Sequence, residues 1–292
     1  MAKKGQARKP AGRRSKNKGA STGNRSMWIA AVWLIVILGC ILFAARQFGY
    51  CSTENNPTGQ GQYDGLDKVI TSPSADEVLI EYKGMDVSFN PWLHIPNWVA
   101  WELTRNETNG TEPRAERFAC DESVAGCPSP KDYLRSGYDR GHMAPAADMK
   151  WDAEAMEQSF FMTNICPQAK SLNTGSWKKL EDKCRTWAEI DSAITIVCGP
   201  IITDNLNKHI GDSKVAVPQR FFKVIISPYA NPPRGIGFIM PNGKAKGGMQ
   251  ACAVTIDSVE AVTGHDFFSA LPDDIENDIE SQCKFHYWST LK

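Results

Sequence analysis

The first fifty residues contain no acidic side chain. They hold ten Lys and Arg residues, so the rest of the chain has 23 basic residues against all 33 acidic ones, a formal charge of −10. A domain this acidic cannot attract a polyanion over its whole surface, because phosphate binding depends on Lys and Arg. If this domain handles nucleic acid, its positive charge must gather in one cleft.

Charged residues are also missing from residues 27–45, a largely apolar run of nineteen residues. That length is enough for a helix to cross a bilayer. Basic residues precede the run and polar residues follow it, which predicts a cytoplasmic N-terminus and an exported domain on the periplasmic or extracellular side. The alternatives are a cleaved signal peptide, which would leave a secreted protein, and a lipoprotein signal acylated at Cys40. The length of the run, and its continuation past Cys40, favour an uncleaved anchor.

No cysteine has the CxxC or CxxH spacing that is typical of a zinc site. Eight of the nine cysteines lie outside the apolar run, and in an exported domain this number predicts disulfides. Cys120 and Cys127 are the first candidate pair, because Gly126 and Pro128 mark a turn beside them. The alternative is that several cysteines are buried as small hydrophobic residues.

The composition changes along the chain and divides it into four parts. Residues 1–26 have hardly any large apolar side chains and are expected to form a disordered basic tail. The apolar run follows, and residues 46–77 are expected to be a polar linker. From residue 78 to residue 292 the patterns are those of a folded domain. Strands are predicted over residues 77–90 (a hairpin turning at 83–84), 97–104, 193–202, 220–227, 235–242 and 251–256.

Helical patterns are fewer. They cover residues 151–161, 175–190 and 273–283, and Asp152 has the residue type and place of an N-cap for the first. The second would bury one face, formed by Trp177, Leu180, Cys184 and Trp187. Strands, two helices, further strands and a terminal helix together predict an α+β fold with a mainly antiparallel central sheet flanked by helices.

One histidine stands out because of its neighbours. His142 follows Arg140 and Gly141 in what is predicted to be an irregular loop. Arginine is seldom buried without a partner, so a histidine beside it is a poor candidate for a core residue. Gly141 would allow a close approach of the backbone to another group.

Downstream of His142, four residues recur at intervals of four: Asn173, Trp177, Glu181 and Arg185. On a helix they would share one side. In the simplest interpretation Asn173 caps the helix, and Glu181 and Arg185 form an ordinary ion pair worth about 0.2–0.5 kcal/mol. In the functional interpretation the Asn173 carbonyl oxygen binds Mg²⁺, an ion that keeps several waters and needs few protein ligands.

Three segments, "DRGHMAP", "TNICPQ" and "LNTGSWKKLEDKCR", occur in this order and resemble the DNA/RNA non-specific endonucleases, the ββα-metal group. The resemblance covers roughly residues 78–291. It implies a ββα-metal nuclease domain that uses Mg²⁺, with Mn²⁺ or another divalent ion as a substitute. The roles that it implies are His142 as general base, Asn173 as direct metal ligand, Glu181 as the residue that orders the waters of the metal, Arg140 and Arg185 as phosphate contacts, Asn164 as a support of the site and its substrate, and Arg117 as a substrate-binding residue.

Phosphodiester hydrolysis accounts for this set of residues. A neutral histidine can accept a proton from the attacking water near pH 7, and fixed positive charge stabilises the charge that develops on phosphate. Contacts to phosphate carry no sequence information. The sequence therefore predicts a membrane-anchored, exported, magnesium-dependent endonuclease of DNA and RNA. It does not decide whether the protein forms a homodimer. The alternatives are a phosphodiesterase of the same fold that acts on nucleotides, and a tethered protein that binds nucleic acid without cleaving it.

Overall fold

The computed structural model describes residues 63–203 and 206–290. All of these residues belong to one compact unit of the chain. The expected basic tail (1–26) and membrane span (27–45) therefore lie outside the described residues. No helix in the described ranges is long and apolar enough to cross a bilayer.

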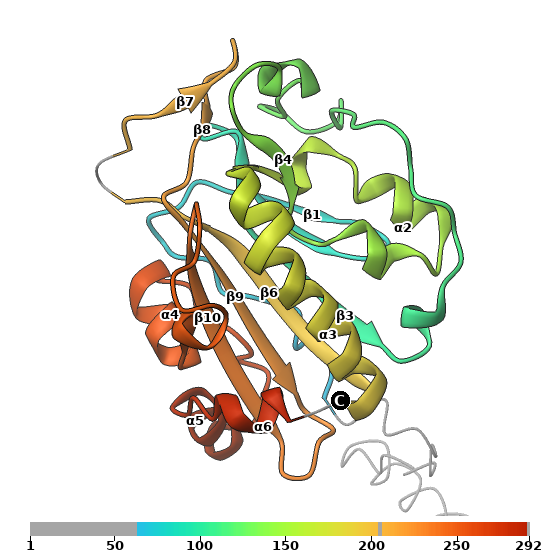
Figure 1. Cartoon of the computed structure of the whole chain (residues 1–292), viewed down its shortest axis with the longest axis vertical. Coiled ribbons are helices and arrows are strands. Elements are labelled where there is room, and N and C mark those ends of the chain that lie inside the picture. Colours follow the sequence, from blue (N-terminus) through green and yellow to red (C-terminus); the bar gives the residue numbers. More distant parts are fainter. Residues whose placement is uncertain (1–62, 204–205, 291–292) are drawn as a thin grey trace, which may run out of the picture. The chain divides into compact units, whose positions relative to one another are not determined.

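A seven-stranded sheet organises the domain (Figure 1). Its strands, in spatial order, are β1 (Val78–Glu81), β2 (Asp86–Asn90), β3 (Ile95–Thr104), β6 (Ala193–Ile201), β9 (Arg220–Ser227), β10 (Arg234–Pro241) and β11 (Ala253–Val254). Every neighbouring pair is antiparallel. The expected antiparallel sheet is confirmed, and so are the hairpin that turns at 83–84 and the strand over 220–227.

The two faces of the sheet form two separate cores. Along β9, Phe221 and Ile225 pack into one core, whereas Phe222 and Val224 pack into the other, because side chains alternate across a strand. The first face is covered by helix α3 (Lys178–Asp191), which runs across β6 and β3 in Figure 1. The second face is covered by α4 (Ile256–Thr263) and α5 (Asp273–Glu280). The expected α+β architecture is therefore present as three layers.

A small ββα unit lies on the α3 face. Strand β4 (Asp139–His142) pairs with β5 (Ile165–Gln168) in an antiparallel ladder that places His142 opposite Ile165. A π-helical segment, Leu172–Trp177, follows and leads directly into α3. Figure 1 shows the start of α3 close to β4. The remaining regular elements are α2 (Ala153–Gln158), α6 (Phe285–Ser289), β7 (His209–Ile210), β8 (Val215–Ala216) and short 3₁₀ turns at Glu107–Asn109, Pro130–Tyr133, Ala146–Met149, Met162–Asn164 and Gln250–Cys252.

The structure corrects three local predictions. The segment that contains His142 is a strand rather than an irregular loop, because its backbone pairs with β5. The second helix begins at Lys178 and not at residue 175, since Gly175 has non-helical backbone angles. Of the strand predicted over 251–256, only Ala253–Val254 is a strand, and Ile256 is the first residue of α4. The prediction was wrong here because a short apolar run does not distinguish a strand from a helix.

Three helix predictions hold. The Asp152 side chain caps α2 by accepting hydrogen bonds from the backbone nitrogens of Glu154 and Ala155, at 2.9 and 3.1 Å. The face of α3 predicted to be buried is buried, including Leu180 and Trp187. Helix α5 also forms within the segment predicted for it.

The folded domain begins before residue 78. In the stretch expected to be a linker (46–77), the described residues 63–77 pack onto the domain: Leu66 is buried, and Ile70 forms a bridge with Asp266. The backbone nitrogen of Ser72 donates a hydrogen bond to Nδ1 of His265 at 3.0 Å. These contacts extend the domain to at least Tyr63.

The seven cysteines within the described ranges are free thiols, so the predicted disulfide between Cys120 and Cys127 is not formed. The Cys120 thiol donates to the backbone oxygen of Cys127 at 3.3 Å, and the Cys127 sulfur accepts from the backbone nitrogen of Asp121 at 3.2 Å. Both sulfur atoms are thus engaged by the backbone of their own turn. Cys166, Cys184 and Cys198 are buried in the core under α3, as small apolar residues would be.

Candidate active site

His142 ends β4 with its side chain almost wholly buried. Its ring lies between those of Phe118 and Phe160, with centroid distances of 5.2 and 4.9 Å. The Nε2 atom has no hydrogen-bond partner among the described residues. Burial, together with the positive charge of Arg114, lowers the pKa of His142 to about 3. The imidazole is therefore neutral at pH 7, which is the form that can accept a proton.

Gly141 makes the tight strand pairing beside His142 possible. A Cβ atom at this position would lie 2.3 Å from the side chain of Gln168, closer than any carbon can approach. The expected close approach at Gly141 is therefore confirmed, and Gln168 is the group that approaches. The Gln168 side chain is fully buried, and both its amide oxygen and its amide nitrogen lack hydrogen-bond partners in the described part of the chain.

Asn164 holds the chain that follows His142. Its Nδ2 donates to the backbone oxygens of Ala144 and Ser159, at 2.9 and 2.8 Å, and its Oδ1 accepts from the Ala144 nitrogen at 2.9 Å. The side chain is fully buried, and all of these bonds go to backbone groups. The structure therefore places Asn164 as a support of the loop after β4, and its amide is not exposed to a substrate.

Asn173 lies in the π-helical segment before α3 and is half-buried. Its Nδ2 donates to the Asp139 carboxylate at 3.0 Å. A carboxylate only accepts hydrogen bonds, so this contact fixes the amide orientation and leaves Oδ1 facing elsewhere. No described residue donates a hydrogen bond to that oxygen. Because Gly175 interrupts the helix, Asn173 does not continue the face of α3 as its spacing predicted.

Glu181 lies in the first turn of α3 and is half-buried. Its carboxylate makes no hydrogen bond with the residues that the structure describes. Burial raises the pKa of Glu181 to about 7, against the opposing effect of the Lys223 charge. An amide oxygen on Asn173 and a carboxylate on Glu181, both without protein donors, are the oxygen groups that suit a hard, largely hydrated cation. The chemistry of these residues thus fits a divalent metal ion.

A second group of acids lies elsewhere. Oxygens of Asp257, Glu260 and Glu280 come within 4.8 Å of one another on α4 and α5. These helices cover the other face of the sheet, so this group is separate from His142. Burial raises the pKa of Glu280 to about 9, which leaves this carboxyl largely neutral at pH 7.

The three predicted arginines have different surroundings. Arg140 donates to the backbone oxygen of Pro130 at 3.0 Å, and its guanidinium carbon lies 5.2 Å from the centroid of the Phe118 ring. Arg185 donates to the buried Asp148 carboxylate at 2.7 Å and also pairs with Asp182, so its charge is already balanced by protein. Arg117 is exposed at the surface beside Phe118.

Arg114 is a site residue that the sequence analysis missed. Its guanidinium carbon lies 4.8 Å from the centroid of the Phe160 ring, and its charge contributes to the low pKa of His142. Arg114 and Arg140 therefore lie over the two rings that flank His142. This is the local concentration of positive charge that an acidic domain needs in order to bind phosphate. The only signal in the sequence was its place three residues before Arg117.

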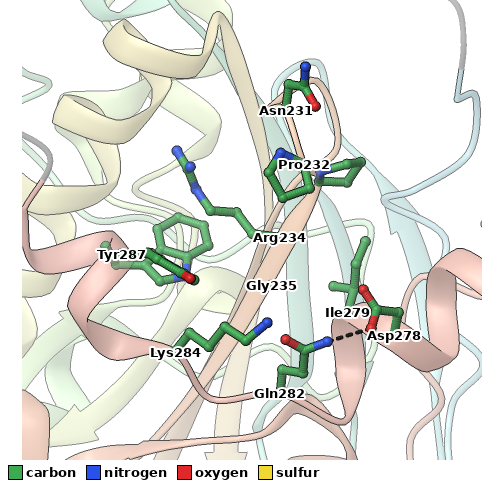
Figure 2. A pocket seen from close by; sticks show the side chains of 11 residues that line it. Asn231, Pro232, Arg234, Gly235, Asp278, Ile279, Gln282, Lys284 and Tyr287 are labelled. Atoms are coloured by element: carbon green, nitrogen blue, oxygen red, sulfur yellow. Dashed lines mark hydrogen bonds between the residues drawn. The ribbon is translucent and has the colours of Figure 1, made fainter.

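A cavity of about 360 Å³ lies away from this site (Figure 2). It is bounded by the β9–β10 loop, α5 and α6, and Figure 2 shows Arg234, Lys284 and Tyr287 around it. Arg234 is paired with Asp191 and lies over the Trp288 ring. None of the predicted site residues lines this cavity, so the chemistry around His142 does not depend on it.

An antiparallel strand pair whose first strand ends in a neutral buried histidine, followed by a helical segment with oxygen groups that no described residue binds, fits a nuclease of the ββα class. The chain belongs to the DNA/RNA non-specific endonuclease family, whose model matches residues 64–274.

Known proteins of this kind are similar over most of the domain. Identity is 34% over 245 residues with the mitochondrial nuclease EXOG of Danio rerio, covering 78% of this chain and 71% of that protein. It is 33% over 226 residues with a nuclease of Nostoc sp., covering 73% and 81%. It is 32% over 230 residues with mouse EXOG, covering 72% and 62%. A chain in the crystal structure of the EndoG/EndoGI complex superposes with a TM-score of 0.62 at 27% identity, covering 68% of this chain and 88% of that one.

The buried histidine should make folding stability depend on pH. Its pKa is about 3 in the folded protein and about 6.5 in an unfolded chain, so between these values the unfolded state binds more protons. The contribution of neutral His142 is complete above pH 6.5 and is lost as the pH falls toward 3, by up to about 1.4 kcal/mol per pH unit. Urea unfolding of the wild type and of His142→Gln across this range should show a free-energy difference that moves in favour of the variant at low pH. A difference that stays constant would contradict the burial of a neutral imidazole.

Proposed function

We propose that this domain is a magnesium-dependent, sugar-non-specific endonuclease that hydrolyses phosphodiester bonds of DNA and RNA, with His142 as the general base. The observation that carries the proposal is the His142 imidazole itself. It is neutral, its Nε2 is unpartnered, and two guanidinium groups lie over the rings that flank it. Membership of the non-specific endonuclease family supports the reaction class.

Each residue has a defined part in this reaction. His142 accepts a proton from the attacking water through its free nitrogen. Arg114 and Arg140 bind the phosphate and offset its charge, whereas Asn164 keeps the loop after His142 in place. Arg185 stays in its ion pair with Asp148 and contributes positive charge near the site. Arg117 is placed on the exposed surface for a more distant substrate contact.

Asn173 would hold the magnesium ion through Oδ1, and Glu181 would accept hydrogen bonds from its waters. The bound ion would supply positive charge to the phosphoryl and leaving oxygens. Asp139 fixes the Asn173 amide, so the orientation of the ligand is set before an ion arrives. None of these groups reads a base edge, which supports activity on DNA and RNA without strong sequence preference.

A plasmid-nicking assay with and without EDTA tests the function. We expect the wild type to nick DNA and to degrade RNA only when a divalent cation is present. His142→Ala should keep DNA binding but lose about 10²–10⁴-fold in cleavage rate, the usual effect of removing a general base. His286→Ala, at an exposed histidine on α6, serves as the control. Binding without cleavage by the wild type would favour a tethered binding protein, and cleavage of nucleotides alone would favour the phosphodiesterase.

Asn173 variants test the metal site. Asn173→Ala should abolish cleavage at low Mg²⁺ and recover partly as Mg²⁺ rises, because the ion loses its only direct protein ligand. Asn173→Asp keeps an oxygen and should retain more activity than Ala. It also places a second carboxylate against Asp139, so its need for Mg²⁺ should be steeper. Nicking rates and melting temperatures are compared across a magnesium series. Rates that follow stability alone, with unchanged magnesium dependence, would reduce Asn173 to a structural role.

We further propose that residues 27–45 anchor the protein in a membrane with the nuclease domain on the exported side. The support is the charge asymmetry around this apolar run in the sequence. A C-terminal reporter that works only outside the cytoplasm should be active, and one that works only in the cytoplasm should be silent. The reverse pattern would place the nuclease inside the cell. Fractionation then separates an anchored protein from one secreted after signal cleavage.

A further inference from the structure

Lys223 lies in the middle of β9, on the α3 face of the sheet. Its neighbours on that face are Phe221 and Ile225, both in the core under α3. The side chain is fully buried, and its ammonium nitrogen has no hydrogen-bond partner within the described ranges. A lysine is almost never fully buried unless it is paired, so this position needs a physical reason.

Two indole rings enclose the ammonium group. Nζ lies 4.9 Å from the centroid of the Trp101 ring and 4.6 Å from that of the Trp177 ring. A cation over an aromatic face is attracted to it, most strongly when both are removed from water. Trp101 belongs to β3, and Trp177 precedes α3. The cation therefore joins two strands of the sheet to the start of the helix.

Both indole nitrogens bind groups of the site. Trp177 donates to the backbone oxygen of His142 at 3.3 Å. Trp101 donates at 3.2 Å to the Asp148 carboxylate, which also accepts the Arg185 guanidinium. The Trp177 ring therefore links Lys223 to the end of β4, which carries His142. The Trp101 ring links Lys223 to the ion pair between Asp148 and Arg185.

The charges around Lys223 come from three elements. The carboxylates of Glu181 and Asp148 and the thiols of Cys184 and Cys198 interact with it electrostatically. Burial by itself lowers the pKa of Lys223. The neighbouring acidic groups together have the larger effect, so the pKa of Lys223 is raised above its ordinary value. The Lys223 charge in turn opposes the effect of burial on the pKa of Glu181.

We propose that Lys223 is a positioning residue of the active site, whose ammonium holds Trp177 against the backbone of His142 and supplies the positive charge that faces Glu181. This inference rests on the proposed nuclease function. Lys223 cannot touch the substrate, since it is fully buried. Removing the Lys223 charge alone takes a buried cation away from the carboxylates of Asp148 and Glu181, so its loss should also cost some stability.

The test compares the wild type, Lys223→Met and Lys284→Met. Lys284 is the matched control, because its ammonium also lies over an aromatic ring, that of Tyr287 at 5.9 Å, but away from His142. Lys223→Met should melt below the wild-type temperature but remain folded at the temperature of the assay, because one cation of a buried charge cluster is lost. Its kcat for plasmid cleavage should fall about tenfold or more, while KM stays within about twofold, because a buried residue affects the reaction and not substrate binding. Lys284→Met should match the wild type in both.

A second readout needs no metal and no substrate. Carboxyl resonances of ¹³C-labelled glutamate are titrated in EDTA, and the signal missing from Glu181→Gln identifies Glu181. In Lys223→Met that signal should titrate about one pH unit or more above the wild type, since an opposite charge has been removed. Lys284→Met should leave it in place. If Lys223→Met does not fold, Lys223→Gln is judged by the same two criteria.

Support requires both effects. A folded variant with unchanged kcat, or with unchanged titration of Glu181, overturns the proposal while leaving nuclease activity of the wild type intact. If the wild type itself does not cleave nucleic acid, the proposed function fails, and the titration alone decides whether Lys223 sets the charge at Glu181.

Discussion

The hydrogen bond from the Trp177 indole to the backbone oxygen of His142 joins the two halves of the site. β4 carries the histidine, whereas the π-helical segment and α3 carry Asn173 and Glu181. α3 is itself held on the sheet by buried side chains such as Leu180 and Trp187. Together with the bond from Asn173 to Asp139 on β4, this contact holds His142 and the oxygen groups in one arrangement. Catalysis requires such groups to be held within a fraction of an ångström of each other.

The core under α3 is unusual in the number of polar atoms that it leaves without partners. Nε2 of His142, Nζ of Lys223 and the amide of Gln168 all lack hydrogen bonds among the described residues. Each such group costs stability, since burial removes its hydrogen bonds to water. Such groups are expected where function opposes stability, because a site must keep groups free for a substrate or an ion.

Electrostatics in this domain is a matter of location more than of total charge. The chain after residue 50 is acidic as a whole, but Arg114 and Arg140 lie over the two phenylalanine rings around His142. Arg185, in contrast, is held by Asp148 and Asp182. The guanidinium groups of Arg114 and Arg140 have no carboxylate partner among the described residues, whereas the paired Arg185 fixes α3 and its surroundings. An acidic net charge is therefore compatible with a nucleic-acid substrate, although it would weaken binding elsewhere on the surface.

The sequence by itself determined the sheet and the local part of the site. β9 could be predicted residue for residue, because its apolar pattern is bounded by clear turn signals. His142, Asn164, Asn173 and Glu181 lie within forty residues, in one ββα unit, so a local motif was enough to find them.

Only the tertiary structure decided which groups are charged and which are free. The low pKa of His142 depends on burial and on Arg114, which precedes β4 in the chain, and the raised pKa of Glu181 depends on burial that Lys223 from β9 partly opposes. In the sequence, Lys223 is a single polar residue within an apolar strand. Its local sequence does not predict that two indole rings enclose it. Burial is a property of the assembled chain, since it depends on segments far apart in the sequence. The same reason explains why Arg185 pairs with Asp148 although its sequence spacing pointed to Glu181.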